Sequence, residues 1–502
     1  MTALLGGIAV LAGAGLIGDG RLTGAQATHL RVDGADWIGV AAAFVFALGL
    51  RSGSRGGPLA LERAEVRHVL LAPVDRTTAM RAPAIRQFRF LLFAAALVGA
   101  VAGVLAAHRL PGDGVAWTAC GALAAVVIVA FGYGTALCAS GWRIPSWAGS
   151  VLALVVVAWA MADAANIAEG SPFVVFGRLA LWPLHFDPIG FVAIGVAAVV
   201  CAVGLSLVGN VSVEAAERRS TLVGQLRFAA TLQDVRTVIV LRRQLAMELP
   251  RLSPWVHVRV HGTGRLPVWT RGVRGVLRWP AARVGRLALL GVIAGLSARA
   301  AWTGTTPMVA VAGVALFIAA LDAVEPLAQE IDHPSRRDSV PHEEGWVEIR
   351  HVPVAIVTMV LVCAVGYAAA LVAGPSKDAA LIGAVCIVPA ALGAVAGALV
   401  SVVAGAPSQA SGGTWSVMPP EVAGMRLVYR TAFPPALAII GTLPVLAARA
   451  AARARPPVPA PSGAAAAGAG VAVVFFLVCG WVRMRGRIHA WWGAQMELSG
   501  RG

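Results

Sequence analysis

The chain contains few residue patterns that could carry out a chemical reaction. A P-loop ATPase needs the pattern G-x-x-x-x-G-K-[ST], because its lysine reaches the β- and γ-phosphates of the nucleotide. The only lysine is Lys377, in the sequence GPSKD, which lacks that frame. The zinc-protease pattern HExxH, the hydrolase pattern GxSxG and paired CxxC motifs are also missing from the sequence. We therefore expect no ATP hydrolysis through a P-loop and predict no catalytic residue.

Two groups of acidic and histidine residues remain as candidates for chemistry. His333 and His342 lie in a polar segment with several carboxylates, a composition that could bind a metal ion. A solvated loop explains the same composition, so we predict no metal site. Asp19, Asp33 and Asp36 could serve glycosyl transfer, through a metal ion or as a general base. Their segment is short and offers no domain that would hold an acceptor.

Composition indicates an integral membrane protein. Of 502 residues, 58% are hydrophobic and 13% are charged, whereas soluble domains have about 45–50% apolar and about 25% charged residues. The net charge of +16 comes almost entirely from arginine, a usage that together with abundant Ala and Gly is typical of a bacterial genome. Nucleic-acid binding would explain such an excess, but in membrane proteins positive charge gathers in cytoplasmic loops beside anionic headgroups. We predict membrane lipids, and no nucleic acid, as partners.

Apolar runs near the length of a bilayer recur along the chain. About 20 apolar residues cross the hydrocarbon core as a helix, and these runs lack the alternation of barrel strands. We predict an all-α polytopic membrane protein with about 12 transmembrane helices, arranged as two six-helix halves joined by a basic cytoplasmic linker. The predicted boundaries are 1–208, 209–283 and 284–502, the last with a short cytoplasmic tail. The expected spans are 3–17, 36–50, 88–107, 115–137, 147–162, 188–208, 284–302, 307–325, 353–373, 379–404, 436–449 and 464–482.

The distribution of basic residues predicts the orientation. Between the expected spans, Lys and Arg number 30 on one side and 7 on the other. Cytoplasmic loops carry the excess of positive residues. Both termini are therefore expected in the cytoplasm, with the chain in a bacterial plasma membrane.

The linker contains two amphipathic patterns. From about 213 to 249, apolar residues recur with helical spacing, and Pro250 ends the pattern. The sequence VWTRGVRGVLRWPAARVGR follows, in which apolar residues alternate with arginines, as suits a helix at the inner membrane interface. A solvated basic loop is the alternative. The predicted residues of this interfacial elbow are Trp269, Arg271, Arg274, Arg278 and Trp279.

Polar residues near the spans are further candidates, because ionisable groups are costly in lipid. Asp322, Glu325 and Arg299 fall near span ends, so we expect structural roles for them. The stretch 163–187 is more informative, because its apolar run PFVVFGRLALWPLHF is too short and broken to span. We predict that it re-enters the outer leaflet or lies along the outer surface, with an extra span or a plain loop as alternatives. Its polar residues include Asp163, Glu169, Arg178 and Asp187.

Together these features resemble the membrane permeases of type-2 ABC exporters. The resemblance is carried by the basic elbow, the stretch 163–187, and polar cytoplasmic segments between the second and third spans of each half, 51–87 and 326–352. The sequence LERAEVRHVLLAPVDRTTAMR is similar to the L-x-x-P-x-x-R-type segment of bacterial members, and its P-x-x-R spacing recurs in PSRR of the second half. In that family the segment forms a coupling helix docked on the ATPase subunit. The resemblance implies this role for Glu62, Glu65, Pro73, Asp75, Arg76 and Arg81, and for Pro334, Arg336 and Arg337.

The resemblance also implies that the function is divided between polypeptides. This chain would form the substrate path of an exporter and hold no cofactor, while ATP and Mg²⁺ would bind to a separate ABC ATPase subunit present in two copies. The first half departs from the family because it lacks an elbow, and the second because an Arg/Ala/Pro-rich loop stands at 449–463. One alternative is a 12-helix secondary transporter of the major facilitator kind, although the connection at 51–87 is long and lacks that family's glycine pattern. A membrane glycosyltransferase-like enzyme is the other alternative to the exporter. The sequence predicts no particular transported substrate.

Overall fold

In the computed structural model the chain divides into two compact units, Met1–Leu232 and Gln233–Gly502, here called unit 1 and unit 2. The described residues are 24–59, 75–211, 254–256, 267–332, 344–404 and 420–499. Within these ranges the regular secondary structure is helical and no strand occurs. The predicted all-α fold is therefore confirmed. The division at residues 208 and 283 stays a prediction, because most of the expected linker, including the pattern at 213–249, lies outside the described residues.

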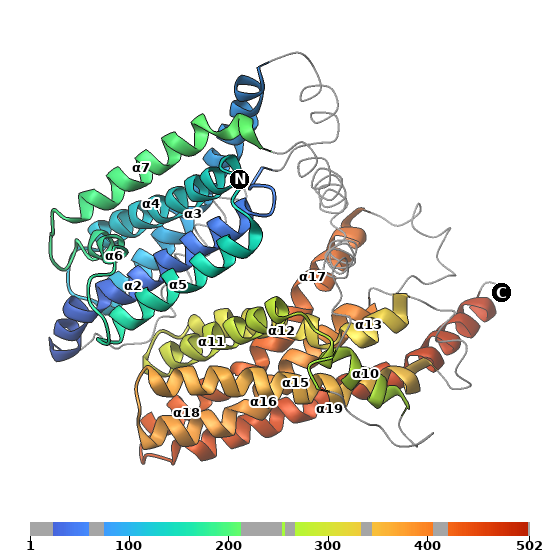
Figure 1. Cartoon of the computed structure of the whole chain (residues 1–502). Coiled ribbons are helices and arrows are strands. Elements are labelled where there is room, and N and C mark those ends of the chain that lie inside the picture. Colours follow the sequence, from blue (N-terminus) through green and yellow to red (C-terminus); the bar gives the residue numbers. More distant parts are fainter. Residues whose placement is uncertain are drawn as a thin grey trace. The chain divides into compact units, whose positions relative to one another are not determined.

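Unit 1 is a bundle of long helices that run side by side (Figure 1). Asp113 accepts a hydrogen bond from the backbone N of Ala116 and thereby caps one of these helices, α4. A seven-residue helix, α6, interrupts the connection between the last two. The helices are α2 (Gly24–Gly53), α3 (Arg76–Arg109), α4 (Gly114–Gly141), α5 (Ser146–Ala164), α6 (Val174–Ala180) and α7 (Gly190–Ser206).

Unit 2 is a second bundle (Figure 1). Its largest apolar core is formed by α11, α12, α15 and α16, with contributions from α17 and α19. The helices are α10 (Pro267–Leu277), α11 (Ala281–Thr303), α12 (Met308–Ala323), α13 (Glu325–Asp332), α15 (Glu344–Val372), α16 (Lys377–Ala404), α17 (Pro420–Thr442), α18 (Pro444–Arg453) and α19 (Ala460–Ser499).

Nine helices in the described ranges are long and apolar enough to cross a membrane, and α12 with α13 would form a tenth as one broken span. These helices coincide with the expected spans, and only two of the expected spans have no counterpart among them. The expected span 188–208 forms α7, which has 17 residues and is shorter than the others. The expected span 3–17 lies outside the described residues, so the count of twelve stays a prediction.

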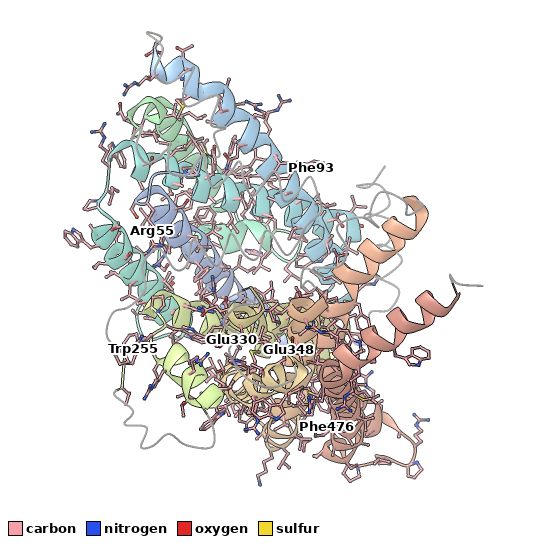
Figure 2. The ribbon with its side chains drawn as sticks, turned by 90° about the vertical axis from the view of Figure 1, so that its right-hand side faces the viewer. Arg55, Phe93, Trp255, Glu330, Glu348 and Phe476 are labelled. Atoms are coloured by element: carbon pink, nitrogen blue, oxygen red, sulfur yellow. The ribbon has the colours of Figure 1, made fainter. Side chains whose placement is uncertain are left out.

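Large apolar side chains cover the outside of these helices. Phe93 on α3 and Phe476 on α19 point away from their helices (Figure 2) and are 70% and 69% exposed. Soluble monomers rarely expose large contiguous apolar surfaces, because water does not solvate them favourably. Together with the span lengths, this surface identifies a membrane-embedded protein.

Glycine brings several helix pairs into close contact. Gly291 and Gly295 form a G-x-x-x-G motif on α11, and a Cβ atom on Gly295 would overlap the backbone of Gly366 on α15. In lipid, such small residues let two backbones approach and gain van der Waals contact. Glycines also bring α3 close to α4 in unit 1, where Gly99 and Gly103 lie against the backbone of α4.

The two units share a packing pattern. If 3–17 is counted as the first span of unit 1, its second to sixth spans are α2, α3, α4, α5 and α7. The six spans of unit 2 are then α11, α12, α15, α16, α17 with α18, and α19. In both units the third span packs on the fourth, the second packs on the fourth and the fifth, and the fourth packs on the sixth. The units differ in one contact, because α16 packs extensively on α17 in unit 2 whereas α4 and α5 form no comparable contact in unit 1. The shared contacts are those expected of a duplicated helical unit.

Candidate functional site

The helices α10 and α13, the start of α15 and the second half of α19 lie at one end of unit 2 (Figure 1). Their charged side chains form ion pairs there. Most of these side chains are buried, which is unusual for ionisable groups in a membrane protein. We call this group the charge cluster. Its members are Arg271, Arg283, Arg286, Asp322, Glu325, Glu330, Glu348, His351 and Arg485.

Arginines of α11 hold the bend between α12 and α13, whose axes differ by 57°. Asp322 and Glu325 lie at this bend, and Arg283 forms ion pairs with both. Arg286 also pairs with Asp322. The Arg283 guanidinium carbon lies 4.3 Å from the ring centroid of Trp279. Asp322 lies in the last turn of α12, where a carboxylate opposes the helix dipole, and its pairs with the two arginines offset that cost.

Two further ion pairs tie neighbouring helices to α13 and α15. Arg271 Nη1 on α10 lies 2.6 Å from Glu330 Oε1 on α13. Arg485 Nη2 on α19 lies 2.7 Å from Glu348 Oε1 on α15, and Arg485 Nη1 donates to the carbonyl of Val403 on α16 at 2.9 Å. Both glutamates, labelled in Figure 2, are buried. A buried carboxylate is costly without a partner of this kind.

His351 lies on α15 about one helical turn after Glu348 and is 4% exposed. Its charged neighbours are Glu330 and Arg271. Neither ring nitrogen has a hydrogen-bond partner within the described part of the chain. A buried polar group left in this way costs about 1–3 kcal/mol, so stability does not account for the presence of a histidine here.

The charge cluster connects several helices of unit 2 through its ion pairs. It joins α13 and the start of α15, the elements on either side of segment 333–343, to α10, α11 and α19. A displacement of α13 or α15 would therefore strain ion pairs on several helices at once. Among the described residues, no group of three or more His, Cys, Asp or Glu side chains could hold a metal ion.

An apolar cavity of about 110 Å³ lies towards the other end of unit 2. Its walls come from α11, α12, α15, α16 and the junction of α17 with α18. Arg299 is the one charged side chain among the described residues that line it. Arg299 Nη1 donates to the carbonyls of Gly374 at 2.7 Å and Ala370 at 3.3 Å, beyond and within the last turn of α15. The cavity can therefore take an apolar group beside a fixed positive charge.

Unit 1 contains a wider groove of about 800 Å³ between α2, α3, α4 and the end of α6. Asp33, Trp37 and Trp117 are among the residues that line it. In unit 2, the first span α11 packs on the second and third spans. The groove of unit 1 lies between α2 and α3, and we assign no ligand to it.

The predicted coupling residues are only partly within the described ranges. Asp75 is the N-cap of α3, and its carboxylate accepts hydrogen bonds from the hydroxyl and the backbone N of Thr78 at 2.7 and 2.9 Å. Arg76 and Arg81 are exposed in the first turns of α3. The others lie outside the described residues: Glu62, Glu65, Pro73, Pro334, Arg336 and Arg337. Their role stays a prediction.

The predicted elbow forms α10, which ends at Leu277. Trp269 is 40% exposed, whereas Trp279 follows the helix and is buried in the core of unit 2. Arg271 pairs with Glu330. The expected pattern of exposed indoles and arginines therefore holds only for part of the segment, and its location at the membrane interface stays a prediction.

The stretch 163–187 folds onto unit 1. Phe176 and Leu179 are buried, and a Cβ atom on Gly177 would overlap the backbone of Ala35 on α2. Arg178 Nη1 pairs with Asp187 Oδ2 at 3.1 Å. Asp163 lies in the last turn of α5, and Glu169 lies in the loop that follows this helix. The short α6 is therefore packed within the bundle, and its depth in the membrane stays a prediction.

The sequence analysis missed Glu330, Glu348, His351 and Arg485. All four fall just outside the expected spans, in segments assigned to loops. The helices continue past those limits, since α15 begins at Glu344 and α19 runs to Ser499. The sequence contained a sign of these longer helices, because charged residues continue the helical spacing of the apolar runs before residue 353 and after residue 482.

Comparison with known proteins gives no relative. No protein-family model, no curated protein and no solved structure matches this chain.

Proposed function

We propose that this chain is the membrane-spanning permease of an ATP-driven exporter of the type-2 ABC kind, which works with separate ATPase subunits. The observation that carries the proposal is the shared helix packing of the two units. Two helical units with recurring helix contacts in one polypeptide are consistent with the pair of membrane domains that such an exporter needs. Two copies of the ATPase would bind ATP and Mg²⁺, one serving each unit.

The coupling elements would lie at the cytoplasmic side, in the bacterial plasma membrane with both termini in the cytoplasm. The distribution of 30 and 7 basic residues supports this orientation. In unit 1 the segment between the second and third spans leads into α3 through Asp75 and Arg76. In unit 2 the equivalent segment leads from α13 into α15. Both helices carry members of the charge cluster.

In this mechanism, ATP-driven closure of the ATPase subunits moves the two coupling segments. Ion pairs from α13 and the start of α15 would carry that movement to α10, α11 and α19. The helices of each unit would then shift as rigid bodies and open the path outwards.

Purification of the tagged chain from its native membrane tests the proposal, with an ATPase subunit expected to copurify. The double variant Asp75→Ala with Arg76→Ala should reduce the amount recovered. Arg143→Ala is the control, because Arg143 is exposed on the same expected side but outside the coupling segments. Failure of any nucleotide-binding subunit to accompany the wild-type chain would count against the proposal.

A proton-coupled secondary transporter is the second candidate, and His351 is the observation that favours it. A buried histidine without a hydrogen-bond partner in the described ranges is the kind of group that carries protons through transporters. Uptake into vesicles distinguishes the two candidates. A pH gradient would drive the secondary transporter without ATP, whereas the exporter would need ATP and its partner.

A further inference from the structure

The apolar cavity of unit 2 has no role in the proposed mechanism. One face of α11 forms a long wall of this cavity, with small residues followed by two large side chains that carry polar groups. Because these positions recur at helical spacing, they share one side of the helix. They are Gly291, Ala294, Gly295, Ala298, Arg299 and Trp302.

The cavity is suited to a short stretch of hydrocarbon. Its volume of about 110 Å³ is smaller than the roughly 150 Å³ of an engineered apolar cavity that stays dry and binds benzene, so it takes only a few carbon atoms of a longer chain. Cys363, Ile382 and Cys386 form parts of the facing walls on α15 and α16. Water gains little in such a space, so an apolar group would fill it favourably.

Arg299 gives the cavity a charged end. Its Nη1 is held by the carbonyls of Ala370 and Gly374, which fixes the guanidinium in place. A guanidinium has five N–H donors, so further donors remain for a ligand. No carboxylate occurs among the described residues that line the cavity, and within those residues Arg299 forms no ion pair. An anionic group would complement this charge.

We propose that the cavity binds an anionic amphiphile, with its carboxylate or phosphate group on Arg299 and the few carbon atoms next to that group between α11, α15 and α16. The ligand has one of two sources, a phospholipid of the membrane or a single-chain molecule that the protein carries. If the exporter assignment holds, the second source names the substrate class. Binding is measured without ATP or a partner, so the two proposals can fail separately.

Fluorescence quenching tests this site. The purified full chain in zwitterionic lipid nanodiscs is titrated with dibrominated stearic acid and with the matching dibrominated alcohol, whose bromine atoms quench nearby indoles. We expect a saturable component for the acid that Trp302→Phe removes. A charge-assisted hydrogen bond predicts acid binding about tenfold tighter than that of the alcohol.

Variants at Arg299 separate the charge from the cavity. Arg299→Gln should bring the acid and the alcohol to similar affinity, while Arg299→Lys should keep the preference for the acid. Arg453→Gln is the matched control, since Arg453 is exposed at the end of α18, and it should behave as wild type. If Arg299→Gln does not fold, the comparison of acid with alcohol in the wild type still decides.

A second measurement uses Cys386, which lines the same cavity. The acid should slow its modification by an apolar maleimide in a variant that keeps only this cysteine. Saturable quenching by dibrominated phosphatidylglycerol in the nanodisc would identify a lipid as the source, and quenching by the fatty acid alone would identify a carried molecule. Equal affinity for acid and alcohol, or no saturable quenching of Trp302 together with no protection of Cys386, would overturn the proposal.

Discussion

Arg485 on α19 donates a hydrogen bond of 2.7 Å to Glu348 on α15, across 137 positions of the sequence. The side chains are 10% and 2% exposed. This contact joins the last long helix of unit 2 to the helix that follows the expected coupling segment. A change of charge at either residue should therefore alter both the stability of unit 2 and its coupling to the ATPase subunit.

Removing one partner of this pair should destabilise unit 2. Arg485→Gln removes the guanidinium that pairs with the buried Glu348 carboxylate, and breaking such a buried pair costs about 3–5 kcal/mol. Replacing both residues with methionine should recover much of that loss. Thermal unfolding of the detergent-solubilised protein measures the effect. As a control, Arg178→Gln breaks the more exposed pair with Asp187 and should cost less than about 1 kcal/mol.

Gly295→Leu should separate α11 from α15. Any side chain at Gly295 meets the backbone of Gly366, which cannot move away as a flexible side chain could. Gly285 lies on the same helix, where a Cβ atom would meet nothing within 4 Å, so Gly285→Leu is the matched control. Helix propensity favours leucine over glycine by up to about 1 kcal/mol. We expect a lower thermal midpoint only for the first variant, and equal midpoints would contradict the close packing.

His351→Leu should leave stability unchanged or increase it. The substitution removes a polar ring that has no hydrogen-bond partner in the described part of unit 2, which relieves a cost of about 1–3 kcal/mol. His108→Leu at the exposed end of α3 serves as the control and should change stability by less than about 0.5 kcal/mol. A clear loss of stability in His351→Leu would mean that the ring is hydrogen-bonded in the membrane. Thermal midpoints of the three proteins provide the comparison.

Asp75 makes the start of α3 sensitive to acid. Hydrogen bonds from the hydroxyl and the backbone N of Thr78 hold the pKa of Asp75 below its usual range. Its stabilising contribution is therefore complete above the unfolded pKa of about 3.9 and is lost as the pH falls through the lower folded pKa. Asp75→Asn keeps a capping oxygen without this titration. Below about pH 4, the wild-type thermal midpoint should fall more steeply than that of the variant, and parallel curves would exclude the effect.

The orientation of unit 1 can be measured with single cysteines in a cysteine-free background. Asp113 precedes α4 and Trp142 follows it, so the two positions lie at opposite ends of one span. The distribution of basic residues predicts the first outside and the second in the cytoplasm. A membrane-impermeant maleimide should label Asp113→Cys in intact cells and Trp142→Cys only after lysis. The reverse labelling pattern would place the proposed coupling segments outside the cell and contradict the proposed orientation.

The positions of most helices follow from the sequence because membrane insertion is a local requirement. A run of about 20 apolar residues must satisfy its own backbone hydrogen bonds, and a helix does so without any partner. The run at 115–137 is an example, since α4 covers it completely. The ends of the helices were less predictable. The charged residues before 353 and after 482 indicated loops, yet α15 and α19 continue through them.

Local composition thus determined that this is a helical membrane protein, and it singled out 51–87 and 209–283 as polar, basic segments unlike a span. Only the tertiary structure decided which side chains meet. Glu348 pairs with Arg485, and Arg299 reaches the end of α15, because glycine contacts set which helices lie against each other. Those contacts join residues far apart in the chain, and the pattern of apolar runs is nearly the same whichever helices become neighbours. The charge cluster and the apolar cavity therefore arise from helix packing, which a pattern read along the chain does not contain.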